Sequence, residues 1–157
     1  MSQTVYIQTP LGIAKIVGDE NGISVISVID EGTVSSEIPT VLQEAVSQLN
    51  DYFEGKRTNF DFKLNPKGTE FQQKVWQALL EIPFGKTVSY MDLSKKLGDV
   101  KAIRAVASAN GKNPLWIVVP CHRVIGTDGS LTGYAGGLWR KKWLLEHENP
   151  TTQGSLF

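Results

Sequence analysis

A single cysteine stands beside a histidine and an arginine in the run Pro120-Cys121-His122-Arg123. The thiolate is the reactive form of cysteine, and cationic neighbours lower the thiol pKa from its ordinary value of about 8.5. We therefore interpret Cys121 as a candidate nucleophile and His122 as its candidate base. Adjacent side chains of an extended strand point to opposite faces, so their contact requires a turn after Pro120 or a bridging water. The alternative is a small core residue that ends an apolar run.

Other chemistries lack the residues that they need. One cysteine with His122 and His147 offers no standard zinc pattern, so no metal is expected. There is no Walker loop and no Gly-x-Gly-x-x-Gly motif after a strand, so no cofactor is expected. A lone cysteine forms no internal disulfide, and no segment resembles a signal peptide or an apolar membrane span. These features predict a soluble cytoplasmic protein without a membrane partner.

The formal net charge is zero, but the charges are segregated along the chain. Residues 1–83 carry 6 Lys or Arg against 11 Asp or Glu, whereas residues 84–143 carry 10 against 3. The second segment therefore has a charge of +7 and could meet a polyanion, with chance as the alternative. Its cations Lys101, Lys112 and Arg123 are our candidate phosphate ligands.

The first 65 residues predict a small α+β lobe without a cluster of chemically active residues. Three β-rich runs are expected at residues 5–9, 12–17 and 23–29. A helix is expected at residues 38–53, followed by a weak strand at residues 59–64. Asn21-Gly22 is a hairpin signal between the second and third runs. The cluster Asn65-Pro66-Lys67-Gly68 marks the boundary, so the predicted domains are 1–65, 66–150 and a tail at 151–157.

Beyond the boundary, the pattern is mainly helical. Thr69 and Gln72 form a capping box, and Ser89 opens a short helix that ends near Gly98. A second helix over 100–110 completes a helix-turn-helix pattern. Its many small residues would let its backbone approach a nucleic-acid groove, with tight helix packing as an equal alternative. An apolar run at 115–119 predicts a buried strand that Pro120 ends.

The run Pro120-Cys121-His122-Arg123-Val124-Ile125 resembles the signature of the O6-alkylguanine-DNA alkyltransferases, and the resemblance extends from residue 69 to residue 148. It includes four further blocks and the pair Asn113-Pro114, all in the same order. Those blocks are Gly85 to Tyr90, Lys101-Ala102-Ile103-Arg104-Ala105-Val106, Gly133-Tyr134-Ala135-Gly136-Gly137 and Lys142-Trp143-Leu144-Leu145-Glu146-His147-Glu148.

This resemblance implies roles for the residues of the site. Cys121 would accept the alkyl group, His122 would take the thiol proton through a water, and Glu148 would orient the imidazole. Tyr90 would donate a hydrogen bond to guanine N3 as the purine leaves. Asn113 would tie the helix-turn-helix to the turn that carries the cysteine.

The resemblance also implies a partner, double-stranded DNA with O6-alkylguanine, from which the nucleotide is flipped out. Arg104 would fill the vacated space while the slim helix lies in the minor groove. Lys101 and Thr127 would contact the DNA backbone. The alkylguanine pocket would be lined by Tyr134, Ala135, Gly136 and Val124. Many relatives have serine in place of Ala135, which puts only a side-chain contact in doubt.

The predicted fold is therefore α+β: a small N-terminal α/β lobe, and a mainly helical C-terminal lobe with a winged helix-turn-helix-like DNA-binding surface. The implied activity is single-use transfer of the alkyl group by a monomer of the single-module bacterial type. Two alternatives are a lesion-binding protein without catalysis, which would lack the cysteine, and a Cys–His hydrolase. The preference between methyl and bulkier adducts, and between O6-methylguanine and O4-methylthymine, stays open.

Overall fold

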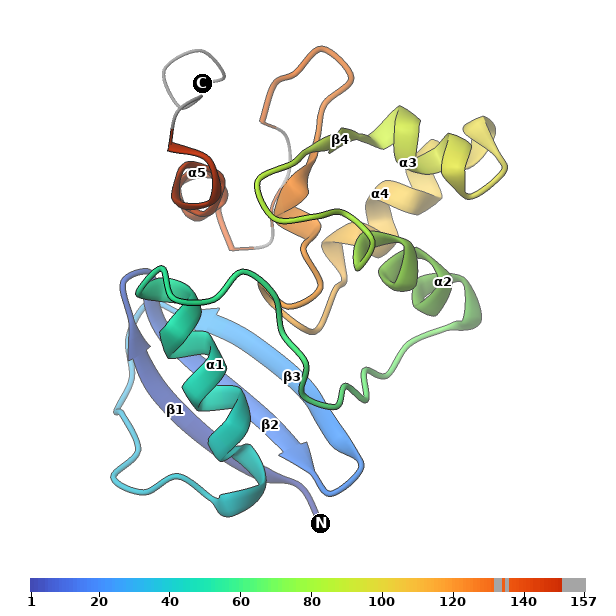
Figure 1. Ribbon diagram of the computed structural model, residues 1–157. Coiled ribbons are helices and arrows are strands. Elements are labelled where there is room, and N and C mark those ends of the chain that lie inside the picture. Colours follow the sequence, from blue (N-terminus) through green and yellow to red (C-terminus); the bar gives the residue numbers. More distant parts are fainter. Residues whose placement is uncertain (132–133, 135, 151–157) are drawn as a thin grey trace. The chain divides into compact units, whose positions relative to one another are not determined.

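The computed structural model describes residues 1–131, 134 and 136–150. Within them the chain forms two compact units, which are described separately (Figure 1). Unit 1 comprises Met1–Lys67 together with Pro114–Val118, and unit 2 comprises the remaining described residues. No helix in these residues is long and apolar enough to cross a membrane.

Unit 1 is built on an antiparallel sheet in the order β1-β2-β3, formed by Gln3–Thr9, Gly12–Asp19 and Gly22–Ile29. The predicted hairpin at Asn21-Gly22 is confirmed, because Gly22 pairs with Asp19 across the turn. The helix predicted for residues 38–53 begins later, as a 3-10 turn, η1 (Thr40–Leu42), followed by α1 (Gln43–Phe53).

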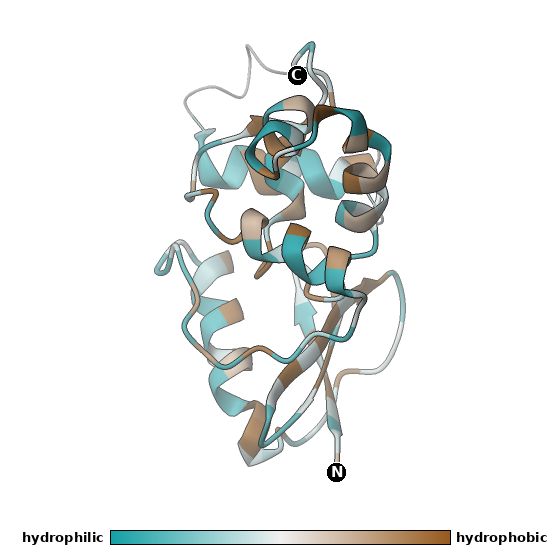
Figure 2. Cartoon of the chain, turned by 90° about the vertical axis from the view of Figure 1, so that its right-hand side faces the viewer, coloured by the Kyte–Doolittle hydropathy of each residue, from teal (hydrophilic) through white to brown (hydrophobic). Residues whose placement is uncertain are grey.

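Helix α1 lies across one face of the sheet (Figure 1). Apolar positions, brown in Figure 2, recur along the strands and supply the buried residues of the core. Burial of these side chains is the main favourable contribution to folding. The fully buried residues of this unit include Val5, Ala14, Ile16, Leu42, Leu49, Tyr52 and Leu115.

The outer edge of β3 is occupied by two irregular segments. The N–H of Ile23 donates to the Lys63 carbonyl at 2.9 Å, and the Ile26 N–H donates to the Pro114 carbonyl at 2.8 Å. The strand predicted for residues 59–64 is therefore wrong, because only Leu64 forms a β-bridge there. These hydrogen bonds satisfy backbone groups that an open sheet edge would expose.

The segment predicted as a strand at residues 115–119 is buried, but it is not a strand. Leu115 forms one β-bridge with Ile26, after which the chain turns. Ile117 has a φ of 72°, which a β-branched residue adopts only under strain. A continuous apolar run predicts burial without a period, so the run could not distinguish a strand from packed turns.

Unit 2 consists mainly of helices. The helices are α2 (Glu70–Leu79), α3 (Tyr90–Lys96), α4 (Ile103–Gly111) and α5 (Leu138–Glu148), with short 3-10 turns η2 (Val100–Ala102) and η3 (Cys121–Arg123). Strands β4 (Val88–Ser89) and β5 (Val124–Ile125) form a two-stranded parallel sheet.

Both predicted helix starts are confirmed. The Thr69 hydroxyl accepts the Gln72 N–H at 3.1 Å while the Gln72 side chain accepts the Thr69 N–H at 2.9 Å. Ser89 caps α3 by accepting the Asp92 N–H at 3.0 Å. Helices α3 and α4 pack side by side across the turn at Gly98, as a helix-turn-helix requires (Figure 1).

Gly22 and Gly55 provide a matched test of the close approach at the sheet edge. Both have positive φ, but a Cβ on Gly22 would lie 3.0 Å from the Lys63 carbonyl oxygen, whereas one on Gly55 would meet nothing within 4 Å. Gly55→Ala should cost about 1–2 kcal/mol of unfolding free energy from conformation alone. Gly22→Ala should cost clearly more, because its φ of 128° lies outside the left-handed α region and its Cβ would meet the Lys63 carbonyl. Both losses are measured by urea denaturation, and equal losses would contradict this expectation.

Candidate active site

Cys121 lies on a tight turn that directly follows the segment contributed to unit 1. Pro120 and Arg123 close this turn, because the Arg123 N–H donates to the Pro120 carbonyl at 3.0 Å. The Cys121 N–H donates to the Val119 carbonyl at 2.8 Å. The turn after Pro120 that a Cys–His pairing requires is therefore present, as η3.

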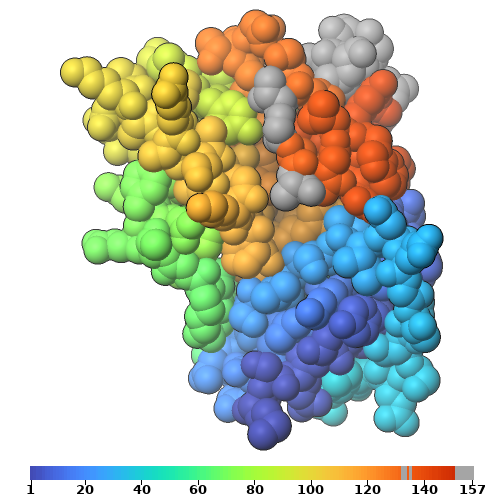
Figure 3. All heavy atoms as spheres, turned by 180° about the vertical axis from the view of Figure 1, so that it is seen from behind, coloured from blue at the N-terminus to red at the C-terminus, as the bar shows by residue number. Residues whose placement is uncertain are grey.

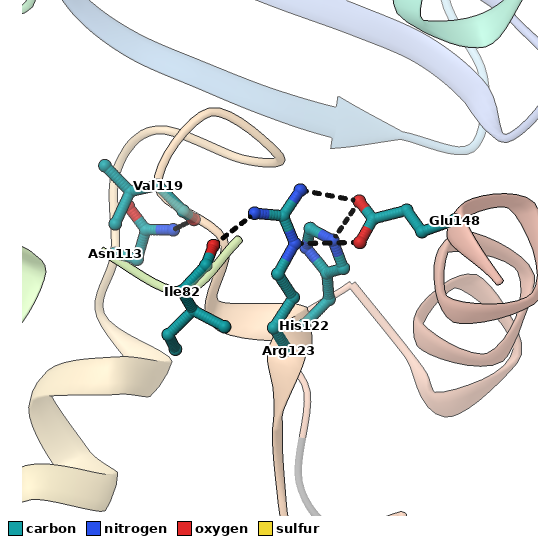
Figure 4. A network of polar contacts seen from close by, with 6 residues as sticks. All are labelled: Ile82, Asn113, Val119, His122, Arg123 and Glu148. Atoms are coloured by element: carbon teal, nitrogen blue, oxygen red, sulfur yellow. Dashed lines mark hydrogen bonds and ion pairs between the residues drawn. The ribbon is translucent and has the colours of Figure 1, made fainter. Parts of the chain in front are cut away.

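His122 is completely buried and its Nε2 lies 2.7 Å from Glu148 Oε2 (Figure 4). Arg123 binds the same carboxylate twice, from Nε to Oε1 at 2.8 Å and from Nη2 to Oε2 at 3.0 Å. Its remaining Nη1 donates to the Ile82 carbonyl at 2.7 Å, and its guanidinium lies 5.8 Å from the centre of the Phe84 ring. One carboxylate at the end of α5 thus holds both side chains.

The protonation states of this network follow from its charges. Burial opposes ionisation of Glu148, but His122 and Arg123 outweigh it and hold the pKa of this carboxyl well below its usual range. Burial lowers the pKa of His122, and the attraction of Glu148 opposes this only in part. A neutral imidazole beside a carboxylate carries its proton on Nε2, so its Nδ1 has a free lone pair. In the described part of the chain, this buried Nδ1 has no hydrogen-bond partner.

The surroundings of the thiol differ from those expected. We predicted that His122 and Arg123 would make them electropositive, but His122 is neutral and Glu148 balances the charge of Arg123. Burial raises the pKa of Cys121, while Asn113, Lys141 and Tyr134 act to lower it. The thiol is therefore protonated at rest, and its use as a nucleophile requires a base.

Asn113 connects the end of α4 to this turn. Its Nδ2 donates to the Val119 carbonyl at 2.7 Å, two residues before Cys121 (Figure 4). This hydrogen bond links the end of the helix-turn-helix to the turn that carries Cys121, as expected for Asn113. Tyr90, the first residue of α3, is half-buried, and its hydroxyl accepts Asn110 Nδ2 at 3.4 Å.

Helix α4 presents small residues and one cation, Arg104, on its exposed face. Arg104, Ala105 and Ser108 are exposed, whereas Val106 and Ala109 are buried. The opposite face packs on α2, and Trp76 Nε1 donates to the Ala109 carbonyl at 2.9 Å. Figure 3 shows the segment from α3 to α4 in yellow, with long side chains standing out into solvent. Ala109 thus packs inside, as the packing alternative predicts, while the approach of the exposed small residues to a groove stays a prediction.

Not all cations of residues 84–143 lie at the surface. Lys101, Lys112 and the hydroxyl-bearing Thr127 are exposed. Arg123 is buried against Glu148, so its prediction as a phosphate ligand is wrong. Arg140 and Lys141 are also buried, which leaves seven of the ten cations available to solvent.

The predicted pocket residues are described in part. Val124 is buried in β5, Tyr134 and Gly136 are half-buried, and Ala135 lies outside the described residues. Sequence reasoning missed Arg140, whose Nη1 donates to the Gly136 carbonyl at 2.9 Å. Among the described residues, no group of three or more His, Cys, Asp or Glu side chains could hold a metal ion.

Sequence reasoning also missed Lys141, whose Nζ donates to the Val124 carbonyl at 2.6 Å. The helical periodicity of α5 is the sequence signal that could have identified Lys141 as buried. Positions 141, 144, 145 and 148 share one face of α5, and all four are buried. Two charged residues, Lys141 and Glu148, therefore stand on an otherwise apolar helix face.

Two family models match the chain. The ribonuclease-like domain of 6-O-methylguanine DNA methyltransferase matches residues 3–66, and the DNA binding domain of the same family matches residues 70–150. The methylated-DNA–protein-cysteine methyltransferase of Methanosarcina acetivorans is 46% identical over 148 residues, which cover 90% of this chain and 94% of the relative.

Solved structures agree with these matches. A crystal structure of the Mycobacterium tuberculosis O6-methylguanine methyltransferase has a TM-score of 0.85 and 42% identity, covering 96% of this chain and 94% of that one. A structure of the M. tuberculosis protein in complex with DNA has a TM-score of 0.84 and 44% identity, covering 92% and 91%. The resemblance inferred from the cysteine signature is confirmed, and the chain belongs to the 6-O-methylguanine DNA methyltransferase family.

Proposed function

We propose that this protein repairs alkylated DNA by transferring the alkyl group from guanine O6 to Sγ of Cys121. The observation that carries the proposal is the buried network of His122, Glu148 and Arg123 next to a protonated thiol, in a chain of this family. Relatives at 43–46% identity are named methylated-DNA–protein-cysteine methyltransferases, and a similar protein has been solved in complex with DNA.

The first step is removal of the thiol proton. His122 Nδ1 accepts this proton through a water molecule, which the unpartnered buried nitrogen is suited to bind. The imidazole becomes cationic, and the Glu148 carboxylate at 2.7 Å stabilises the new charge. Arg123 keeps the carboxylate ionised and fixed for this purpose.

The second step is displacement at the alkyl carbon. A bond forms between Sγ and the carbon while the bond from carbon to O6 breaks, and the electron pair remains with the purine. Tyr90 donates a hydrogen bond to N3 and so stabilises the leaving group. The product is a thioether without a route back to the thiol, so each molecule acts once. The reaction needs a reduced thiol, which favours a reducing compartment such as the cytoplasm.

Access to the alkyl group requires that the nucleotide leave the duplex, because a buried thiol cannot reach a stacked base. The exposed face of α4 enters the minor groove of double-stranded DNA, where its small residues permit close approach. Arg104 fills the gap, and no described residue binds its side chain in the free protein. Lys101 and Thr127 contact the backbone, and Tyr134, Ala135, Gly136 and Val124 line the pocket. One monomer acts on each lesion.

Transfer itself is tested by mass spectrometry of the intact protein after mixing with a duplex that contains O6-methylguanine. The protein should gain one methylene at Cys121, and the amount of product should never exceed the amount of protein. Cys121→Ser should abolish transfer but still bind the duplex. Product beyond one equivalent would refute single use, and turnover of an ester or amide would indicate a Cys–His hydrolase instead.

The unit formed by His122 and Glu148 is tested by combining substitutions. His122→Ala should slow transfer severely, and adding Glu148→Gln to that variant should cost little more in rate. Glu148→Gln leaves Arg123 buried without its anion, so its unfolding free energy should fall by about 3–5 kcal/mol. Rates are therefore compared only after circular dichroism shows that each variant is folded. Full additivity of the two rate effects would contradict a shared role.

The role of Arg104 is tested with two substrates, only one of which requires that a nucleotide be flipped out of a duplex. Arg104→Ala should slow transfer from duplex O6-methylguanine at saturating DNA. The apparent free-energy barrier should rise by roughly 1–3 kcal/mol, the typical loss for one specific arginine contact. Free O6-benzylguanine should react at nearly the wild-type rate. Lys101→Ala is the matched control, because it removes an exposed cation that fills no gap. A parallel fall in both rates would show that Arg104 supports the fold or the pocket.

A further inference from the structure

Trp139 lies at the N-terminal end of α5 and keeps 57% of its surface exposed. This fraction is large for a tryptophan, because tryptophan side chains are highly buried on average. The core does not need this side chain, since the buried face of α5 begins at the next residue, Arg140. The role of Trp139 therefore has to be sought in its immediate contacts.

The indole of Trp139 covers two neighbours. The guanidinium of Arg140 lies 4.5 Å from the centre of the Trp139 ring, which is a cation–π contact. The edge of the indole lies against Gly137, because a Cβ on this glycine would stand 3.3 Å from Cδ1 and 3.4 Å from Nε1 of Trp139. Trp139 thus covers a buried cation and the residue at which the chain enters α5.

Arg140 connects this cover to the segment that is expected to line the alkylguanine pocket. Its Nη1 donates to the Gly136 carbonyl at 2.9 Å, and the Gly137 N–H donates to the Tyr134 carbonyl at 2.9 Å. A planar guanidinium can stack on a ring and donate at the same time, and a hydrogen bond is stronger where water is excluded. We call the pair Trp139 and Arg140 the clasp, because it ties Gly136 to the first turn of α5.

We propose that the clasp holds the segment around Tyr134 and Gly136 ready to receive the alkylated guanine, so that Trp139 and Arg140 are positioning residues of this site. The proposal rests on the proposed function, because it takes Tyr134 and Gly136 as pocket residues. The clasp takes no part in making or breaking bonds. Its effect is on binding, since a segment that is already ordered costs less free energy to order when the base enters.

The first test uses free O6-benzylguanine and the full-length protein, and it follows the rate of transfer to Cys121 as the concentration of the base increases. Trp139→Ala removes the cover, and Trp139→Phe retains a ring that can stack on the guanidinium. Arg140→Lys retains the charge but loses the planar donor. Leu138→Ala is the matched control, because Leu138 is 48% exposed one residue earlier and has no ring. Thermal denaturation verifies that each variant is folded.

The half-saturating concentration should rise about 10-fold in Trp139→Ala and Arg140→Lys, as expected if the segment then adopts its binding arrangement about one tenth of the time. The limiting rate should keep its wild-type value, and so should alkylation of Cys121 by iodoacetamide, which needs no purine pocket. Trp139→Phe and Leu138→Ala should stay within about 2-fold of wild type.

An unchanged half-saturating concentration in Trp139→Ala would overturn the proposal. A joint fall in the limiting rate and in the reaction with iodoacetamide would also overturn it, because it would show that the clasp supports the fold in general. Wild-type protein that does not react with O6-benzylguanine would count against the proposed function instead.

Hydrogen exchange followed by NMR tests the clasp without any substrate. The Gly137 N–H, bonded to the Tyr134 carbonyl, should exchange about 10-fold faster in Trp139→Ala than in wild type. The Ile82 N–H, which donates to the Leu79 carbonyl at 3.0 Å elsewhere in unit 2, should keep its wild-type rate. An unchanged rate at Gly137 would overturn the proposal, and faster exchange at both amides would assign Trp139 to general stability.

Discussion

The carboxylate of Glu148 is the group on which the chemistry of the site depends. Without Arg123, this buried anion would pair with His122 and favour the protonated imidazole, which is no longer a base. Because Arg123 binds both carboxylate oxygens, the anion is already balanced, and His122 can remain neutral at Nδ1. Burial is the main cause of the lowered pKa of His122, and the positive charge of Arg123 acts in the same direction.

Burial of the Cys121 thiol limits which electrophiles it reacts with. A protonated cysteine with 8% of its surface exposed reacts slowly with electrophiles in solution. Such a thiol becomes a strong nucleophile only where a base removes its proton next to a substrate that is held in place. Burial thus keeps the single cysteine available for the proposed transfer.

The sequence predicted the local features that depend on a few neighbouring residues. Asn21-Gly22 turns a hairpin, and Thr69 with Gln72 caps a helix, because these effects come from local backbone geometry. The pairing of His122 with Glu148 followed from the family signature, and local chemistry would not have predicted it. The burial of Arg123 was missed because it depends on a carboxylate 25 residues later in the chain. Lys141 could have been found from the helical period of α5, where it shares a face with Leu144 and Leu145.

Because Pro114–Val118 belong to unit 1, the chain cannot be divided after residue 67 without removing part of that unit. A polypeptide that ends at Lys67 would lack Leu115, a fully buried residue, and would leave the N–H and carbonyl of Ile26 without their partners at Pro114 and Trp116. The boundary in the sequence is therefore not a boundary between independent folding units. A cut at residue 67 would keep all three strands but would leave the edge of β3 without the segment that covers it.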